Sequence, residues 1–550
     1  MKKKLQQVAM LTVASALVLS ACGGGGKEAT SGNNNNNTSN NTQNNQQQNT
    51  QTREKLTLNW MVLVGNPNAQ LPSPDKDFVK KTIEEKFNVT LNLDYLANAN
   101  DYLSKLNMKV SSGDIPDMFH MTGTDSSKYI IDKVPLDMTN WVTPQNMPNY
   151  FKYWISELEM QRYQIHNVFM RAPIPFNREQ FASHYVRKDW IDALNKKDPS
   201  LNLKVPTNYE EFIKVAKAFT FNDPDGNGKN DTYGFTAAAN GNAIPRDFPE
   251  WLKNNLAPGF FIENGYFIDT GSDIRVANVL MDIKNLLALG VVDPDWFLQK
   301  PGQQLEKVQQ GRVGMFYATA RDAVFENSPN SIQKKTRDVT GQPAEFVPFN
   351  IAPENPIGYQ ALPGNAWMLS PKAGDAKIKR TLEILDWLAG EEGFLLTHYG
   401  LEGVHYTRQG NKITIDPDAY QKDIVQNGSF LDIYAGIFSN IGIFPTPLGL
   451  ERIAPNETDR DRQIAETVKN YKYTLLGTNL APVPGMDLAA FRKQLYAYQN
   501  KILFEEKDAS NWPKYREELM TKYNGKGLFE GYASQVAAAL KQDIKFKWEN

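Results

Sequence analysis

Three features that mark common protein classes are scarce in this sequence: cysteine, long apolar runs and an excess of one charge. Its 550 residues include a single cysteine, Cys22, so the fold must hold without an intramolecular disulfide. Beyond the first twenty residues, no apolar stretch approaches the ~20 residues of a membrane-spanning helix, which argues against a channel or permease. The 60 basic and 62 acidic residues leave a net charge of −2, a balance that argues against a nucleic-acid partner.

Familiar catalytic motifs are also missing. None of the five histidines belongs to a His-Glu-x-x-His motif, and the sequence has no Gly-x-Ser-x-Gly elbow and no Walker loop. Asp223 and Asp225 resemble the Asp-x-Asp pair of some phosphatases, but no apolar strand leads into them. A carboxylate pair for glycoside cleavage stays open as an alternative, because so many acidic residues offer candidate pairs. The motif search therefore identifies no catalytic residues.

Cys22 stands where a bacterial lipoprotein carries its lipid. Three lysines follow Met1, an apolar stretch runs over residues 8–19, and Leu19-Ser20-Ala21-Cys22 resembles a lipobox. We therefore expect a signal peptide over residues 1–21 and a lipidated Cys22, which would hold the chain on the outer face of a Gram-positive type cell membrane. A plain signal peptide with an incidental cysteine is the alternative. Loss of the three lysines would bring the net charge from −2 to −5.

The segment after Cys22 has no apolar surface to bury. Residues 23–26 are all glycine, and residues 33–48 are almost entirely Asn, Gln, Ser and Thr. Ordering such a stretch would cost backbone entropy with no compensating burial. We interpret residues 22–52 as a flexible tether, with a prion-like aggregation role as the competing interpretation.

Hydrophobic periodicity predicts an α/β fold from Arg53 onwards. Apolar residues alternate from Leu56 to Trp60 and again from Val89 to Tyr95, as in strands, and a helical pattern over 78–87 lies between them. A second helical stretch near 102–110 and a short strand at 118–119 follow. This β-α-β-α-β order predicts a mostly parallel sheet with helices on its faces. Two later helices are predicted, one capped by Thr207 and Glu210 and one with apolar residues at 378, 382, 385 and 388.

A set of short motifs resembles one family over nearly the whole chain. The segment from Lys105 to Asp117 matches a helix, Ser-Gly-Asp-x-Pro-Asp, strand pattern. Five further motifs follow in the order of that family: Val186–Trp190, Asp223–Asp231, Gly290–Asp295, Gly311–Met315 and Tyr399–Tyr406. Together with the lipobox they resemble the family 1 extracellular solute-binding proteins of ABC importers, of the large Bacillus and Paenibacillus oligosaccharide-binding type.

The resemblance implies a two-lobed, type 2 periplasmic-binding-protein-like fold. We expect lobe 1 to comprise residues 53–182 and 366–432, and lobe 2 to comprise 183–365 and 433–550. The chain would cross between the lobes near 175–185, 353–367 and 430–447. It would act as a monomer that captures an oligosaccharide and delivers it to the permease subunits of an ABC importer, without enzymatic activity. The alternatives are a cell-surface glycan lyase or hydrolase, and a binding protein of the same fold for a non-sugar solute.

One loop resembles the first part of an EF-hand. Oxygen-bearing residues at relative positions 1, 3, 5, 7 and 9 are Asp223, Asp225, Asn227, Lys229 (through its carbonyl) and Asp231, with glycine at position 6. In related proteins a glutamate after the position-9 aspartate completes such a site, but this chain has Thr232 there. We expect a structural calcium ion in this loop; a turn that caps the preceding helix is the alternative.

Aromatic rings at strand ends are candidates for stacking on sugar. Ligands of parallel sheets gather beyond the carboxyl ends of strands. The candidate ligand-binding residues are Trp60, His120, Phe316, Tyr317 and Trp367. Related sugar-binding proteins present a stacking ring where Phe316 and Tyr317 lie. For each ring, packing in the core is the alternative, and Trp190 is assigned to structure.

Overall fold

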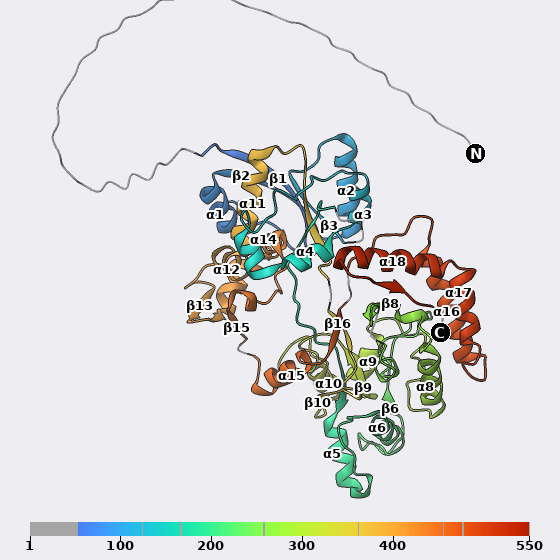
Figure 1. Ribbon diagram of the computed structural model, residues 1–550. Coiled ribbons are helices and arrows are strands. Elements are labelled where there is room, and N and C mark those ends of the chain that lie inside the picture. Colours follow the sequence, from blue (N-terminus) through green and yellow to red (C-terminus); the bar gives the residue numbers. More distant parts are fainter. Residues whose placement is uncertain are drawn as a thin grey trace, which may run out of the picture. The chain divides into compact units, whose positions relative to one another are not determined.

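The computed structural model describes residues 53–123, 125–165, 168–256, 259–360, 362–454, 456–475 and 478–548 (Figure 1). The chain divides into two units, Met1–Arg53 and Glu54–Asn550, and the helices and strands below belong to the second. The predicted signal peptide, Cys22 and the tether lie outside the described residues. No helix within the described residues is both long enough and apolar enough to cross a membrane.

The first lobe is built on a five-stranded sheet in the order β2-β1-β3-β12-β4. Its strands are β2 (Val89–Leu96), β1 (Leu56–Leu63), β3 (Met118–Thr122), β12 (Asn365–Leu369) and β4 (Ala172–Pro173). Strand β1 pairs in parallel with β2 and β3, whereas β12 runs antiparallel to β3 and to β4. The predicted β-α-β-α-β order is confirmed.

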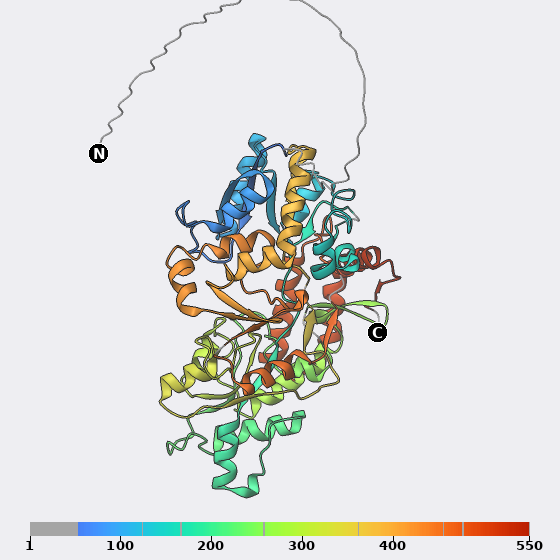
Figure 2. The ribbon, with the colours of Figure 1, turned by 90° about the vertical axis from the view of Figure 1, so that its left-hand side faces the viewer.

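Helices cover both faces of this sheet (Figure 1). Met61 and Phe119 pack with α2 (Ala99–Ser112) and α3 (Ser126–Ile131), whereas Trp60 and Met118 pack on the opposite face. That face is covered by α1 (Phe78–Phe87), α11 (Asp375–Ala389), α12 (Glu391–Tyr399) and α14 (Leu431–Phe438). In Figure 2 the gold helix α11 runs beside the blue strands. The apolar residues predicted for α11 are buried, as expected.

The remaining elements of this lobe are short. They are the helices α4 (Glu157–Tyr163) and α13 (Pro417–Tyr420), the π-helical turns Tyr150–Trp154 and Gln421–Val425, the 3-10 turn Thr446–Leu448, and a small sheet of β13 (Tyr406–Gln409), β14 (Lys412–Ile415) and β15 (Glu451–Ile453).

The Ser-Gly-Asp-x-Pro-Asp motif joins α2 to β3 and β1. Helix α2 ends at Gly113, whose φ of 80° lies in the left-handed region that favours glycine. Four residues later, the buried carboxylate of Asp117 accepts the N–H of Asn59 in β1 at 2.8 Å and contacts the ammonium of Lys377 in α11 at 3.1 Å. The motif therefore stops one helix and fixes the start of the next strand.

The second lobe is built on a four-stranded sheet in the order β10-β5-β9-β6. Its strands are β10 (Phe346–Phe349), β5 (Ser183–Arg187), β9 (Val313–Ala318) and β6 (Tyr233–Phe235). Strand β9 is parallel to β6 and antiparallel to β5. The carboxyl ends of β6 and β9 and the start of β5 therefore lie at one edge.

Helices and a small sheet complete the second lobe. The helices are α5 (Lys188–Lys197), α6 (Tyr209–Phe221), α7 (Glu250–Lys253), α8 (Val276–Ala288), α9 (Gln303–Gln309), α10 (Ile332–Thr340), α15 (Asp459–Lys469), α16 (Leu488–Phe504), α17 (Trp512–Thr521) and α18 (Gly525–Leu540), with 3-10 turns at Pro199–Leu201 and Thr270–Ser272. The small sheet holds β17 (Lys545–Phe546), β8 (Tyr266–Asp269) and β7 (Phe260–Glu263).

Helix α6 is capped one residue later than predicted. Asn208, not Thr207, is the N-cap and accepts the N–H of Glu211, while the Glu211 carboxylate binds both the backbone N–H and the hydroxyl of Thr207. The predicted apolar face of α6 is buried. Trp190 is also buried, edge-on to Phe219, which confirms its structural role.

Between β4 and α15, the chain passes from one lobe to the other three times. The segments run from β4 to β5, from β10 to β12, and from α14 to α15. The side chain of Asn177 links the first and third segments, since it donates to the carbonyl of Gly442 at 3.1 Å and accepts from the N–H of Phe444 at 2.8 Å. In the second segment, β11 (Gly358–Gln360) pairs in parallel with β16 (Tyr473–Leu475).

One lobe boundary differs from the prediction. A division after residue 432 falls inside α14, whose buried residues Ile433, Ile437 and Phe438 pack in the core of the first lobe. Ile443 and Leu450 belong to the same core. The third part of lobe 1 thus extends to about residue 450, because a helix with one buried face cannot be divided between two cores.

Gly314 in β9 gives a test of this packing. A Cβ at this position would come within 2.1 Å of Cδ2 of Phe219 and 2.9 Å of Cε3 of Trp190. We expect Gly314→Ala to lower the free energy of unfolding by about 1–3 kcal/mol, because both rings must move in a packed core. Gly65→Ala is the control, since nothing lies within 4 Å of its Cβ. Equal midpoints of denaturant unfolding for the two variants would contradict this packing.

Candidate functional site

In the first lobe, the sequence-predicted ligand residues lie in the core. Trp60 is 1% exposed, Trp367 is 0% exposed, and both pack in the same hydrophobic cluster. His120 is 1% exposed and its ring links two elements: Nδ1 accepts the N–H of Leu63, and Nε2 lies 3.1 Å from the carbonyl of Ile437. Burial lowers the pKa of His120 to about 4, so the ring is neutral. These three side chains are covered by protein and are corrected to structural roles.

In the second lobe, the two predicted rings separate. Phe316 is 0% exposed and stacks on Tyr185, with ring centroids 5.4 Å apart. Tyr317, the next residue of β9, points to the opposite face of the sheet and is only partly buried. Of the predicted rings, Tyr317 thus keeps access to solvent, whereas Phe316 belongs to the core.

His184 and Asp247 surround Tyr317 at the sheet edge. His184 pairs with Tyr317 across β5 and β9, and their ring centroids lie 5.1 Å apart. Nε2 of His184 lies 2.8 Å from the backbone carbonyl of Asp247, and because a carbonyl only accepts, this nitrogen carries the proton. Burial lowers the pKa of His184 to about 4, so the ring is neutral. This bond ties the loop after β6 to the edge.

Two tyrosines that sequence reasoning missed complete the neighbourhood of Tyr317. Burial raises the pKa of the Tyr317 hydroxyl, and nearby Asp247, Tyr473 and Tyr359 raise it further. Tyr359 lies in β11, and Tyr473 in β16 has a hydroxyl that accepts the N–H of Ala182 at 3.1 Å. Tyr359 falls inside the predicted crossing 353–367, so the sequence could have indicated it as a candidate ligand residue. No sequence pattern marked Tyr473. Three partly buried phenols therefore gather where the crossing segments meet the second sheet.

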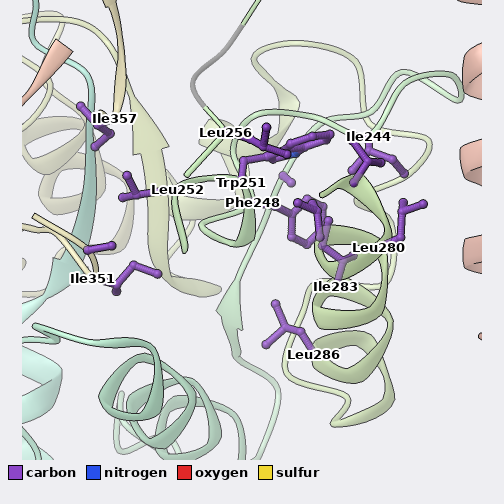
Figure 3. Packing of buried hydrophobic residues seen from close by; sticks show 14 of the residues in the cluster. Ile244, Phe248, Trp251, Leu252, Leu256, Leu280, Ile283, Leu286, Ile351 and Ile357 are labelled. Atoms are coloured by element: carbon purple, nitrogen blue, oxygen red, sulfur yellow. The ribbon is translucent and has the colours of Figure 1, made fainter. Parts of the chain in front are cut away.

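A cavity of about 350 Å³ lies in the second lobe, and its lining includes Arg246, the residue before Asp247. It falls within the range of about 300–1,000 Å³ typical of ligand pockets. The loop after β6, the end of β8 and helix α16 line it, through residues that include Arg246, Trp251, Asp269, Arg492, Tyr496 and Gln499. The loop is held by apolar residues: Figure 3 shows Ile244, Phe248 and Trp251 beside Leu280 and Ile283 of α8.

A second cavity, of about 270 Å³, lies at the crossing segments. Its lining includes Arg321, Glu457, Glu466 and Lys469. Arg321 pairs with Glu457 through two contacts, and Lys469 pairs with Glu466 at 2.7 Å. Because these charges neutralise each other, the cavity has less to offer a ligand than the one that Arg246 lines.

The predicted calcium loop brings its oxygen ligands together. The Asn227 amide donates to Asp225 at 2.9 Å and to Asp231 at 3.1 Å, and the N–H of Gly228 lies 3.2 Å from the Asp223 carboxylate. Burial, together with hydrogen bonding and charge repulsion from Asp223 and Asp231, raises the pKa of Asp225. The loop therefore brings together carboxylate and amide side chains, the kinds of ligand that a hard cation takes.

Two observations limit this loop as a metal centre. Within the described residues, no group of three or more Asp, Glu, His or Cys side chains is arranged as metal ligands. Thr232 is buried and donates to the carbonyl of Phe219 at 2.6 Å, so its hydroxyl holds the end of α6 and faces away from the loop's oxygens. Lys229 stands in the loop with its N–H bonded to the Asn227 side chain at 2.8 Å.

Comparison with known proteins places the chain among binding proteins. It is 25% identical over 391 residues to the polygalacturonan/rhamnogalacturonan-binding protein YtcQ of Bacillus subtilis, covering 67% of this chain and 70% of YtcQ. It is 26% identical over 317 residues to the fructooligosaccharide ABC transporter substrate-binding protein FusA of Streptococcus pneumoniae, covering 50% of this chain and 51% of FusA.

Solved structures share the fold at low sequence identity. An HMO-binding, ABC-transporter-associated solute-binding protein of Bifidobacterium longum infantis superposes with a TM-score of 0.66 at 16% identity, over 88% of this chain and 99% of that one. A FusA EF-hand mutant of S. pneumoniae in complex with fructo-nystose superposes with a TM-score of 0.53 at 16% identity, over 88% of this chain and 98% of that one. The fold is thus the two-lobed one of solute-binding proteins.

The family model of bacterial extracellular solute-binding proteins matches residues 67–393, which is more than half of the chain. The match includes every strand of the two main sheets except β1, and it spans Tyr317, Arg246 and the Asp223 loop. The chain therefore belongs to the family of bacterial extracellular solute-binding proteins.

Proposed function

We propose that this protein is the lipid-anchored, extracellular binding subunit of an ABC importer and that it captures an oligosaccharide. The family match over residues 67–393 carries the proposal. The names of YtcQ, FusA and the Bifidobacterium protein support the class of ligand, since each refers to an oligosaccharide or a polysaccharide. The sugar would pass to permease subunits on other chains, and the binding subunit would act as a monomer.

The group around Tyr317 supports a sugar as the ligand. Sugars present C–H faces that stack on rings and hydroxyls that need hydrogen-bonding partners, and Tyr317, Tyr359 and Tyr473 offer both. The three tyrosines come from β9, β11 and β16, so two of them lie on or beside the crossing segments. A ligand held at this point would favour whichever arrangement of the lobes it contacts more extensively.

We further propose that the protein does no covalent chemistry on its ligand. The curated relatives are binding proteins, and capture requires only differential affinity. A cell-surface lyase or hydrolase, the rival class, would need an acid and a base held beside the sugar. The rings around Tyr317 include a histidine whose pKa of about 4 leaves it neutral and bound to a backbone carbonyl.

A thermal-shift screen followed by product analysis tests the function. We expect at least one oligosaccharide to raise the melting temperature, since a ligand at 100 times its Kd stabilises the folded state by about 2.7 kcal/mol. Chromatography after long incubation should return that saccharide intact. We expect Tyr317→Ala to weaken binding with little effect on the unliganded melting temperature.

Phe316→Ala is the matched control on the same strand. It removes a core ring from the other face of β9, so it should cost about 3–5 kcal/mol of stability. Accumulation of cleaved sugar would replace the importer assignment with the enzyme. If Tyr317→Ala unfolds the protein as Phe316→Ala does, the ring of Tyr317 is structural.

We propose that Asp223, Asp225, Asn227, Asp231 and the carbonyl of Lys229 hold a structural calcium ion. The bonds of Asp225 and Asp231 to the Asn227 amide support it, and so does the reference to an EF-hand in the FusA mutant. When bound, the ion would neutralise three neighbouring carboxylates and brace the turn between α6 and β6.

Chelation gives the corresponding measurement. We expect EDTA to lower the melting temperature of the wild type and to leave Asp225→Ala unchanged, because that variant no longer binds the ion. Asp338→Ala, which removes an exposed carboxylate that pairs only with Lys334 in the same helix, should keep the sensitivity. A wild-type melting temperature indifferent to EDTA and to added calcium would end this proposal.

The lipid anchor is tested at Cys22. We expect Cys22→Ser to release the protein into the medium of expressing cells, because no other cysteine can accept the lipid. Ser20→Ala keeps a small residue before the cysteine and should stay in the membrane fraction. Retention of Cys22→Ser by membranes would show that a different attachment holds the chain.

A further inference from the structure

Among the described residues, none accepts a hydrogen bond from Nη1 of Arg246, a side chain that lines the cavity of the second lobe. Its guanidinium stacks on the ring of Trp251, 4.0 Å from the ring centroid, and Nη1 is buried with no hydrogen-bond acceptor. Two other interior arginines are paired: Arg187 binds the carboxylate of Asp189, and Arg171 donates to the carbonyl of Tyr163. An unpaired buried donor on a charged group is costly, so it calls for an explanation.

The one carboxylate that lines the cavity is already occupied. Asp269 is 2% exposed, and its carboxylate accepts hydrogen bonds from Nη1 and Nη2 of Arg492 at 2.8 and 2.5 Å. It also accepts the N–H and the hydroxyl of Ser272, at 3.1 and 2.6 Å. With two guanidinium groups and one carboxylate among its lining residues, the cavity carries a net positive charge.

The other groups that act on Arg246 do not cancel this charge. They are Asp269, Arg492 and the hydroxyls of Tyr496 and Tyr317. Burial is the main reason why the pKa of Arg246 falls to about 10, which still leaves the guanidinium charged at neutral pH. Tyr317 is among the groups whose charge acts on Arg246, which relates the cavity to the rings of the proposed sugar site.

We propose that this cavity receives the carboxylate of an acidic sugar, so that the ligand is an oligosaccharide containing uronic acid. The inference rests on the proposed function and adds the charge of the ligand to it. A guanidinium presents parallel N–H donors that match the two oxygens of a carboxylate. Trp251 holds the plane of this guanidinium, and the Trp251 indole N–H is itself fixed by the carbonyl of Pro245 at 3.1 Å.

Neutral partners in the lining suit the rest of a sugar ring. Tyr496 and Gln499 lie one turn apart on α16, and Gln499 is held by a bond from its amide to the carbonyl of Gly271 at 2.8 Å. The chemistry of the site thus combines one anion-binding group with hydroxyl and amide groups. A carboxylate would give the buried Nη1 of Arg246 a charged acceptor, which a wholly neutral sugar lacks.

Binding of matched acidic and neutral sugars tests this proposal. Trimers of galacturonate, glucuronate and mannuronate, their carboxyl-reduced neutral counterparts, and a panel of neutral oligosaccharides are titrated into the mature protein by calorimetry. We expect an acidic trimer to bind, and its carboxyl-reduced form to bind at least about tenfold more weakly. Arg246→Gln should remove this discrimination, whereas Arg312→Gln, an exposed arginine of the same lobe outside the cavity, should preserve it.

A measurement without ligand separates a binding role from a structural one. If Arg246 serves a ligand, Arg246→Met should keep or raise the melting temperature of the unliganded protein, because it removes an unpaired buried charge. A clear fall in the melting temperature would assign Arg246 to packing on Trp251 and overturn the proposal.

The outcomes of these titrations test the acidic ligand and the proposed importer function separately. Binding of neutral oligosaccharides with no preference for the acidic trimers overturns the acidic ligand and leaves the importer subunit standing. If no saccharide of any kind binds, the proposed function and this inference both fall.

Discussion

Alternation of side chains along the strands is the constraint on which the rest of the structure depends. Both sheets are covered by helices on both faces, so neighbouring residues of a strand enter two different cores. Trp60 and Met61 separate in this way in β1, as do Phe316 and Tyr317 in β9. A ring in the middle of such a strand is buried whatever its chemistry, and only one near a strand end can meet a ligand. Tyr317 lies next to the last residue of β9, after the buried residues 313–316, and this position gives it that access.

Polar side chains connect the crossing segments to one another. Asn177 links the first crossing to the third, and the hydroxyl of Tyr473 links β16 to the backbone of Ala182 at the end of the first. The pairing of β11 with β16 adds the second crossing. Because all the segments are tied by hydrogen bonds, a ligand placed beside Tyr359 and Tyr473 contacts the region through which any movement of the lobes must pass.

Some charged side chains of this protein form ion pairs, whereas others do not. Arg321 with Glu457 and Arg492 with Asp269 satisfy each other and hold the fold together. In contrast, Nη1 of Arg246 has no acceptor among the described residues, and Asp225 and Asp231 both accept from the amide of Asn227. A native fold accepts such unbalanced charges where a ligand or an ion of opposite charge compensates them. One site would take an anion and the other a cation.

The sequence by itself determined the α/β class, the order of the first elements, the helix faces and the family, because local periodicity and motif spacing report on neighbouring residues. The roles predicted for Tyr317 and for the Asp223 loop stay predictions. Only the tertiary structure decided that Trp60, His120, Phe316 and Trp367 are core residues, since a ring in the core and a ring at a site have the same sequence pattern. It also brought Tyr473, Tyr359 and Arg246 to Tyr317, across up to 227 positions of chain between Arg246 and Tyr473. Contacts of that separation depend on how sheets and crossings meet, which no local pattern records.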